Sequence, residues 1–224
     1  MGNHLYCYKM TWDTESAPNP HHGVLTLAIC KPTIRRCSQV GDWISGWTAK
    51  TVHGKDKLYF FDHRKLIYLA RIKEKLTIAQ YWDRYSQKRP HVIGYNQDPS
   101  IKKTCGGSSK KEENAIFDSG DNIYKPLVDN PVVFGDFEQI KNNNHKEEDK
   151  AHDLKGRYVL ICEEFYYYGV DNAIDVDKDI LNVIVPRCKK LSLSDCMGFI
   201  EYIKKDNRAT IQGNYENHIE QKRL

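Results

Sequence analysis

The sequence has no apolar run that approaches the roughly 20 residues of a membrane-spanning helix. Its first residues, MGNHLYCYKMTWD, place polar and charged side chains where a signal peptide needs an apolar stretch. Its seven cysteines form no CxxC pair and no regular framework, so no disulfide scaffold is indicated. We therefore expect a cytoplasmic protein that does not enter the membrane.

Common catalytic motifs are also missing. The sequence has no phosphate-binding GxxxxGK[ST] loop and no GxSxG, HExxH or GxGxxG pattern. The PCxxC half of the zinc deaminase signature is absent. His21 and His22 are adjacent, so on a strand they would face opposite ways and rarely share one metal ion. We expect no metal site and no cofactor, and the sequence identifies no catalytic residue.

What is present is the composition of an ordinary globular domain. The 224 residues are 40% hydrophobic and 29% charged, enough for one domain with a sizeable core. The net charge of +4 comes from 34 basic and 30 acidic residues, well short of a protein that coats a nucleic-acid duplex. Lys31, Arg35 and Arg36 do cluster, which is consistent with a local anion site and equally with a solvated surface.

Short apolar segments separated by turn signals predict an α+β fold. No strand–helix repeat with a period near 30 residues occurs, so a doubly wound sheet is not expected. We predict a small curved sheet or a partly closed β-barrel, decorated with helices. Strands are predicted over residues 5–10, 42–48, 57–75 (with 65–76 as one long strand), 157–169 and 179–186, and residues 24–29 could be helix or strand.

Three helices are predicted from capping residues and spacing. Pro32 suits the first turn of a short helix that ends at Arg36. Thr77 caps a second helix, and Ser194 caps a last one, each with an apolar face at helical spacing. Two polar segments, 96–114 and 142–153, are predicted to be loops, and the histidines of the second, His145 and His152, need no function.

The stretch APNPHHGVLTLAICKPTIRRC, residues 17–37, is the first candidate for a binding site. A rigid loop with Asn19 and His22 precedes a helix start with Lys31, Arg35 and Arg36, an arrangement that suits a phosphate group. We predict that the three cations border one concavity with Asn19 and His22 at its rim. The alternative is a surface loop followed by a turn with solvated arginines.

Aromatic and amide side chains supply the rest of a possible nucleotide site. Trp43 and Trp47 would share one face of a strand and could stack on a base, or fill the core. Asp121 and Asn122 could read the edge of a base. The candidate site residues are Asn19, His22, Lys31, Arg35, Arg36, Trp43, Trp47, Asp121, Asn122, Tyr124 and Tyr168.

The run APNPHHGVLTLAICKPTIRRCSQVGDWISGW, with GDNIY at 120–124 and YVLICEEFYYYG at 158–169, resembles the second nucleotide-modification-associated domain family of phages and bacteria. The VGDW stretch and the strand after it are also similar to the PUA-like superfamily, which includes EVE, YTH and ASCH domains. The resemblance implies a PUA-like domain over residues 1–190, with a C-terminal helical extension, 191–224, packed on it.

The resemblance implies a setting of modified bases rather than a particular reaction. The first hypothesis is a module that binds a modified base or nucleotide, free or in nucleic acid, with no membrane partner. The second is an enzyme of a phage DNA-modification or defence pathway, in which Asp121, His22 or a cysteine acts as acid, base or nucleophile. A third is an interaction scaffold in phage defence or counter-defence. The oligomeric state is not indicated.

Overall fold

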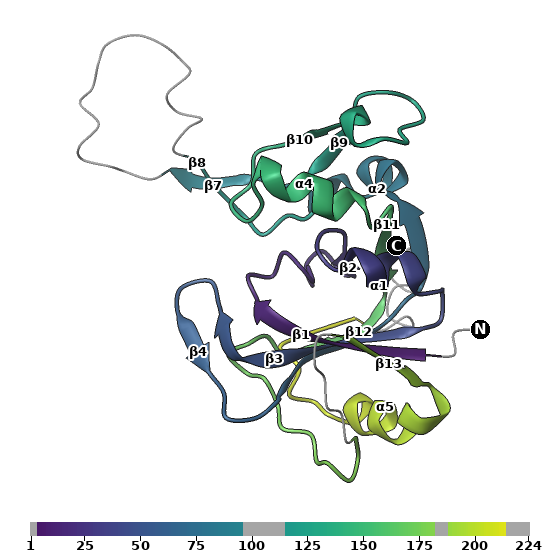
Figure 1. Ribbon diagram of the computed structural model, residues 1–224. Coiled ribbons are helices and arrows are strands. Elements are labelled where there is room, and N and C mark those ends of the chain that lie inside the picture. The colour runs from purple at the N-terminus through teal and green to yellow at the C-terminus, as the bar shows by residue number, and fades with distance from the viewer. Residues whose placement is uncertain (1–3, 96–114, 182–187, 214–224) are drawn as a thin grey trace, which may run out of the picture.

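The computed structural model describes residues 4–95, 115–181 and 188–213, in which helices and strands both occur (Figure 1). This confirms the predicted α+β class. The predicted loop over 96–114 and most of the predicted strand over 179–186 lie outside these ranges. Within them, each helix is too short or too polar to cross a bilayer.

The largest sheet has seven strands in the order β13-β1-β3-β5-β12-β14, with β4 paired to β3. The pair β1–β3 is parallel and the other pairs are antiparallel. In the described residues the sheet ends at β13 and β14, so it is open and the partly closed barrel is not formed. The strands are β1 His4–Trp12, β3 Trp43–His53, β4 Leu58–Phe60, β5 Leu66–Arg71, β12 Glu164–Tyr167, β13 Cys188–Ser192 and β14 Ile211–Gly213.

A second sheet of three strands, β2-β11-β6, lies above the first in Figure 1. All its pairs are antiparallel. Two further antiparallel pairs, β9–β10 and β7–β8, lie beyond it. Their bounds are β2 Leu25–Leu27, β6 Glu74–Thr77, β7 Val92–Tyr95, β8 Ala115–Phe117, β9 Tyr124–Pro126, β10 Phe137–Gln139 and β11 Tyr158–Cys162.

Two segments pass from one sheet to the other. The predicted single strand over 65–76 divides into β5 and β6, and the one over 157–169 divides into β11 and β12. The Lys73 N–H donates to the Ile161 carbonyl at 2.8 Å, which ties the two crossings together. Each segment has apolar residues in both sheets and charged residues near the crossing, Arg71 and Lys73 in the first and Glu163 and Glu164 in the second.

The helices are short and follow local sequence signals in part. Thr77 and Gln80 form the predicted cap, with reciprocal side-chain and backbone hydrogen bonds. Ser194 does not cap the last helix but begins a 3₁₀ turn before it. The predicted loop over 142–153 contains a helix. The helices are α1 Pro32–Cys37, α2 Ile78–Arg84, α4 Glu147–Leu154 and α5 Met197–Lys204, with 3₁₀ turns at Ser86–Lys88, Phe134–Asp136 and Ser194–Cys196.

The elements form layers (Figure 1), and three larger hydrophobic clusters lie between them, with a smaller fourth around Val52. Helix α5 packs its apolar side chains on one face of the large sheet. The opposite face packs against β2, β11 and α1. The far side of the three-stranded sheet is covered by α2, β9 and β10. A domain boundary at residue 190 stays a prediction, and it would fall within β13.

Candidate functional site

The APNP and GDN motifs meet inside the molecule, as predicted, in a buried polar network. The Asn19 amide donates to the Ser119 carbonyl at 2.8 Å. The ammonium of Lys88 donates to Asn19 Oδ1 at 2.8 Å and to the carbonyls of Asn19 and Val24. The Asp121 carboxylate accepts from Thr26 and from Tyr81, at 2.7 and 2.6 Å. We call Asn19, Thr26, Tyr81, Lys88 and Asp121 the buried network.

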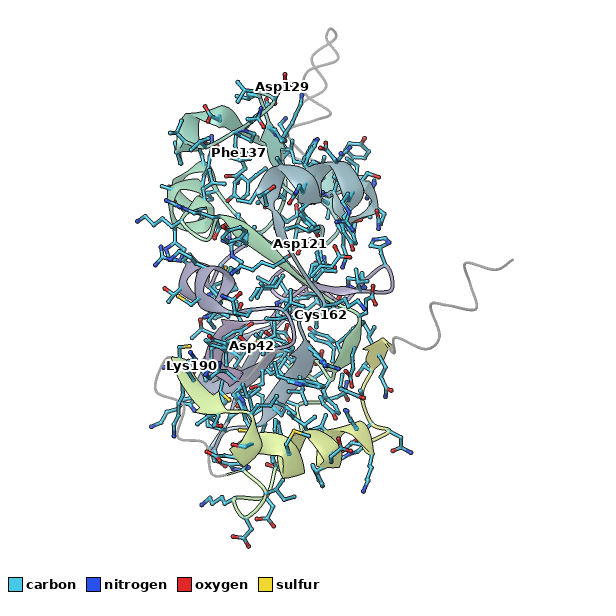
Figure 2. The ribbon with its side chains drawn as sticks, turned by 90° about the vertical axis from the view of Figure 1, so that its right-hand side faces the viewer. Asp42, Asp121, Asp129, Phe137, Cys162 and Lys190 are labelled. Carbon is cyan, nitrogen blue, oxygen red and sulfur yellow. The ribbon has the colours of Figure 1, made fainter. Side chains whose placement is uncertain are left out.

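Desolvation governs the charges of this network. Burial lowers the pKa of Lys88 to about 8, although the nearby Asp121 carboxylate opposes the shift. Burial raises the pKa of Asp121, against Lys88 and its hydroxyl donors. In Figure 2, Asp121 lies within the molecule between Phe137 and Cys162. The two charges stabilise each other inside the fold.

The predicted edge readers, Asp121 and Asn122, are therefore not available to a base. Asp121 is 1% exposed and its carboxylate is engaged by protein hydroxyls. The Asn122 amide donates to the carbonyls of Tyr81 and Tyr85, at 3.1 and 3.0 Å. Both side chains fasten the GDN turn to α2, which corrects the prediction that they read a ligand.

Arg35 is likewise an internal residue and not a phosphate ligand. Its side chain is 0% exposed. The guanidinium donates to the Cys30 carbonyl at 2.8 Å and to the Tyr158 carbonyl at 3.0 Å, and also to the carbonyls of Ala28 and Asp153. Burial lowers the pKa of Arg35, which the nearby Asp153 carboxylate counteracts. Arg35 thus ties α1 to β11 and to the end of α4.

The predicted concavity of three cations does not form. Arg36 is exposed, and its carbonyl accepts from the Lys75 ammonium at 2.7 Å. His22 is exposed on its loop with a left-handed φ of 57°. Of the three cations, Lys31 borders a pocket. Lys31, Arg35 and Arg36 are close in sequence, but their side chains lie in different environments.

The predicted stacking residues lie in the core. Trp43 and Trp47 are 4% and 3% exposed and pack with α5 on the same face of the large sheet. Their shared face agrees with the two-residue period, but neither indole is open to a base. Tyr168 is buried in the same cluster. Tyr124 is also buried, and its hydroxyl donates to Asp153 Oδ2 at 2.9 Å.

A pocket of about 380 Å³ opens where the end of β1 faces the segment before α4. Its size is within the range of small-molecule sites. From the Ala17–Cys37 stretch, Ala17, Cys30 and Lys31 contribute to its wall, and the use of this stretch in a nucleotide pocket stays a prediction. We call it the Trp12 pocket, and its lining is Met10, Thr11, Trp12, Thr14, Ser16, Ala17, Cys30, Lys31, Asn143, Asn144, His145 and Asp149.

The Trp12 pocket offers an aromatic surface, a cation and hydrogen-bonding groups. Trp12 is 60% exposed and stacks on His53, with ring centroids 4.0 Å apart and planes 11° apart. The Lys31 ammonium lies 4.7 Å from the centre of the Tyr8 ring, and burial lowers its pKa. The Asn144 amide donates to Ser16 Oγ at 2.5 Å. The sequence did not single out Trp12, because an isolated tryptophan at a strand end has no pattern.

The backbone is constrained where this pocket meets α1. Cys30 and Lys31 both adopt left-handed φ angles, 58° and 43°. Proline favours extended backbone in the residue before it, so Pro32 disfavours right-handed geometry at Lys31 but does not itself explain the left-handed one. The Cys30 N–H donates to Asp153 Oδ1 at 2.6 Å, so the strained turn is held from α4. The turn places both side chains at the pocket wall.

Cys30, His145 and Asp153 form a cluster in that wall. His145 Nε2 lies 3.3 Å from Cys30 Sγ and 3.4 Å from Asp153 Oδ2. The ligand atoms of the three residues all lie within 4.8 Å of one another. Burial and the Asp153 carboxylate raise the pKa of the Cys30 thiol to about 12, so the isolated thiol is protonated and a poor nucleophile at neutral pH.

Sequence reasoning missed this cluster for a simple reason. The contacts join residues 115 and 123 positions apart, so no local spacing reveals them. His145 was assigned to a solvated insertion, but it is only 12% exposed. The sequence offered one indication of the cluster, which is that Cys30 directly precedes Lys-Pro within the motif stretch.

A comparison with protein families gives a match over nearly the whole chain. The family described as nucleotide modification associated domain 2 matches residues 2–219. No curated protein and no solved structure matches the chain. The match includes β1, the Ala17–Cys37 stretch, α4 and α5, and so every segment that forms the Trp12 pocket.

Proposed function

This chain belongs to the nucleotide modification associated domain 2 family, and we propose that it binds a nucleotide or modified base in the Trp12 pocket. The observation that carries the proposal is one pocket that combines the exposed Trp12 indole with the Lys31 cation. The family connects the protein with nucleotide modification. The pocket supplies the chemistry by which an unstacked base and its phosphate are recognised.

Stacking is the main source of affinity in this proposal. Base–aromatic stacking is worth about 1–3 kcal/mol per base and depends little on which base is bound. His53 supports one face of the Trp12 ring at a 4.0 Å centroid distance, so the ring is oriented before a ligand arrives. A preoriented ring loses little entropy on binding.

Selectivity would come from the groups around the ring. The Asp149 carboxylate lines the pocket and can accept from an exocyclic amine, whereas the Asn143 and Asn144 amides already donate to the Phe117 carbonyl and to Ser16 Oγ. The Lys31 ammonium can meet a phosphate as a point charge. The proposal has three further parts. The domain is similar to PUA-like base-binding domains, it acts in the cytoplasm, and it belongs to a phage or bacterial DNA-modification pathway.

A second candidate function is catalysis on the bound nucleotide. It is favoured by the positions of Cys30 and His145, which line the same pocket and contact each other at 3.3 Å. Of the groups first considered for catalysis, His22 does not line this pocket and Asp121 is enclosed in the buried network.

The test is direct binding of nucleosides, nucleotides and single-stranded oligonucleotides, with mass spectrometry of any small molecule released from the purified protein. Trp12→Ala should lower the affinity for every bound ligand roughly ten- to a hundredfold. Lys31→Gln should lower the affinity for nucleotides and leave the affinity for nucleosides nearly unchanged. Trp82→Ala is the matched control, because Trp82 is a partly exposed tryptophan outside the pocket.

Three results would decide between the candidates. Equal affinity in Trp12→Ala and the parent protein would contradict the binding proposal. A time-dependent change in an added nucleotide that is lost in Cys30→Ser would support catalysis. A nucleotide that copurifies unchanged would support the binding module.

A further inference from the structure

We propose that Cys30, His145 and Asp153 bind a divalent metal ion of the zinc class, with an open coordination position toward the Trp12 pocket. The three residues come from the turn before α1, the segment before α4 and α4 itself. Two of them, Cys30 and His145, line the pocket. The metal would therefore lie between the interior and the ligand space.

The two distances from His145 Nε2 fit a tetrahedral zinc site, and the third, from Cys30 Sγ to the Asp153 carboxylate, is within 4.8 Å. Zinc bonds of about 2.3 Å to sulfur and about 2.0–2.1 Å to nitrogen and oxygen give tetrahedral edges of about 3.5 Å for S···N and about 3.3 Å for N···O. The structure has 3.3 Å between Cys30 Sγ and His145 Nε2, and 3.4 Å between His145 Nε2 and Asp153 Oδ2. An ion could bind without rearrangement of the backbone.

Convergence on a single nitrogen atom favours an ion over hydrogen bonds alone. Neutral imidazole Nε2 carries either one hydrogen or one lone pair, so it makes one good hydrogen bond. Here the same Nε2 is close to both Cys30 Sγ and Asp153 Oδ2. A metal ion on that lone pair would contact the sulfur and the carboxylate at the same time.

Other hydrogen bonds hold each ligand in place. The Tyr124 hydroxyl donates to Asp153 Oδ2, and the Cys30 N–H donates to Asp153 Oδ1. The backbone of His145 donates to Asn142 Oδ1 at 2.7 Å, and its carbonyl accepts from the Gln139 amide at 2.8 Å. In known sites a ligating histidine also donates its other ring N–H, but His145 Nδ1 has no hydrogen-bond partner among the described residues, so His145 is held through its backbone.

The donor set selects the type of metal. Sulfur and imidazole suit zinc and related transition metals, whereas magnesium and calcium prefer oxygen donors. Three protein ligands with a free position are typical of zinc sites that bind a water molecule or a substrate atom. This inference stands apart from base binding by Trp12, although a metal at the wall would add a phosphate or water contact to the proposed function.

Cobalt(II) provides the test, because a thiolate ligand on cobalt gives a charge-transfer absorption band that hydrogen-bonded thiols lack. The purified chain is treated with a chelator and titrated with cobalt. We expect the band to saturate at one equivalent per chain and to vanish on addition of zinc. A wild-type protein without this band would overturn the proposal.

Variants then assign the ligands. Cys30→Ser should abolish the band, and His145→Ala should lower zinc affinity by more than the roughly 10–100-fold that loss of an outer partner costs. Cys37→Ser and His152→Ala are matched controls, because both residues are exposed and lie outside the cluster. A band that survives in Cys30→Ser would also overturn the site.

The two proposals can fail separately. Trp12→Ala should lower nucleotide affinity roughly ten- to a hundredfold and leave the cobalt band intact, because Trp12 is not a ligand of the cluster. Loss of the band without loss of nucleotide affinity in Cys30→Ser would support a metal site that is not needed for binding. A wild-type chain that binds nucleotide but gives no band would contradict the metal site alone.

Discussion

The buried network and the Trp12 pocket share one stretch of sequence, Ala17–Cys37, but use polar groups in opposite ways. In the network, the donors of Lys88 and the acceptors of Asp121 are engaged by neighbouring protein groups. In the pocket, the Trp12 ring and the Lys31 side chain border open space. The first region fixes the fold, and the second remains available for a ligand.

The difference teaches how to interpret a motif rich in polar residues. A polar side chain that the fold itself satisfies is needed for stability, whatever its motif suggests. Asn19 and Arg35 belong to this group, because their partners are protein carbonyls and a buried ammonium. Binding residues are better sought among side chains that border a pocket.

The largest effect is expected for Arg35→Ala, which would break the structural side of the comparison. Removal of the guanidinium leaves the carbonyls of Cys30, Ala28, Tyr158 and Asp153 without their donor in the interior. We expect a loss of about 3–5 kcal/mol in the free energy of unfolding, measured in urea. The exposed Arg36→Ala is the control, within about 0.5 kcal/mol of the parent. Equal stability of the two variants would refute the structural role.

A smaller loss is expected for Asp121→Asn. The amide keeps the shape of the side chain but removes the charge beside Lys88, and it presents a donor where Thr26 and Tyr81 already donate. We expect a loss of about 1–3 kcal/mol in unfolding free energy. Nucleotide affinity and base preference, measured on the folded variant, should not change. A changed base preference without a change in stability would show that Asp121 contacts the ligand and would contradict its structural role.

The smallest effect is expected for Glu15→Gln and concerns how stability depends on pH beside the pocket residues Thr14 and Ser16. Hydrogen bonds from His21 and Lys55 lower the pKa of Glu15 to about 2, from a reference value of 4.5. A depressed carboxyl pKa adds stability above the unfolded value, and this stability is lost as pH falls through the folded value. Glu15→Gln should be less stable than the parent at pH 7, by up to about 1 kcal/mol because the partners are partly solvated.

Thermal unfolding from pH 7 to pH 2 provides the measurement. The difference in stability between the parent protein and Glu15→Gln should become smaller as the pH falls from about 4.5 to 2. Glu148→Gln is the control, since Glu148 is 77% exposed and contacts only the exposed Lys146 among described ion pairs. A gap that stays constant across this range would rule out the ion pair as its cause.

Local sequence signals predicted those parts of the fold that local physics determines. The Thr77 cap and the start of α1 at Pro32 depend on near neighbours, and each is found, whereas β1 is a strand as predicted but is buried on both faces from Leu5 to Tyr8. Sheet exchange between β5 and β6 depends on what covers each segment. Arg71 and Lys73 lie at the division, but exposed charges also occur within continuous strands, so they did not predict it by themselves.

The sequence pointed to a stretch that borders a pocket, but of the predicted site residues only Lys31 is among those that line it. The motif stretch does border a pocket, through Ala17, Cys30 and Lys31. Residue type alone did not show that Trp43 faces α5 while Trp12 faces solvent, because both are tryptophans in strands. That choice is made by long-range packing, which a single sequence does not reveal.

The long separation between contacting segments has a consequence for synthesis on the ribosome. Strand β2 pairs with β11, and Cys30 is bound by Asp153, 123 residues further along the chain. At 5–20 residues per second, translation needs roughly 6–25 s to supply that partner. During this interval β2 has no partner strand on its β11 side, and the turn at Cys30 lacks the hydrogen bond from its N–H to Asp153. We therefore expect the ligand space to be completed late, after the N-terminal strands have left the exit tunnel.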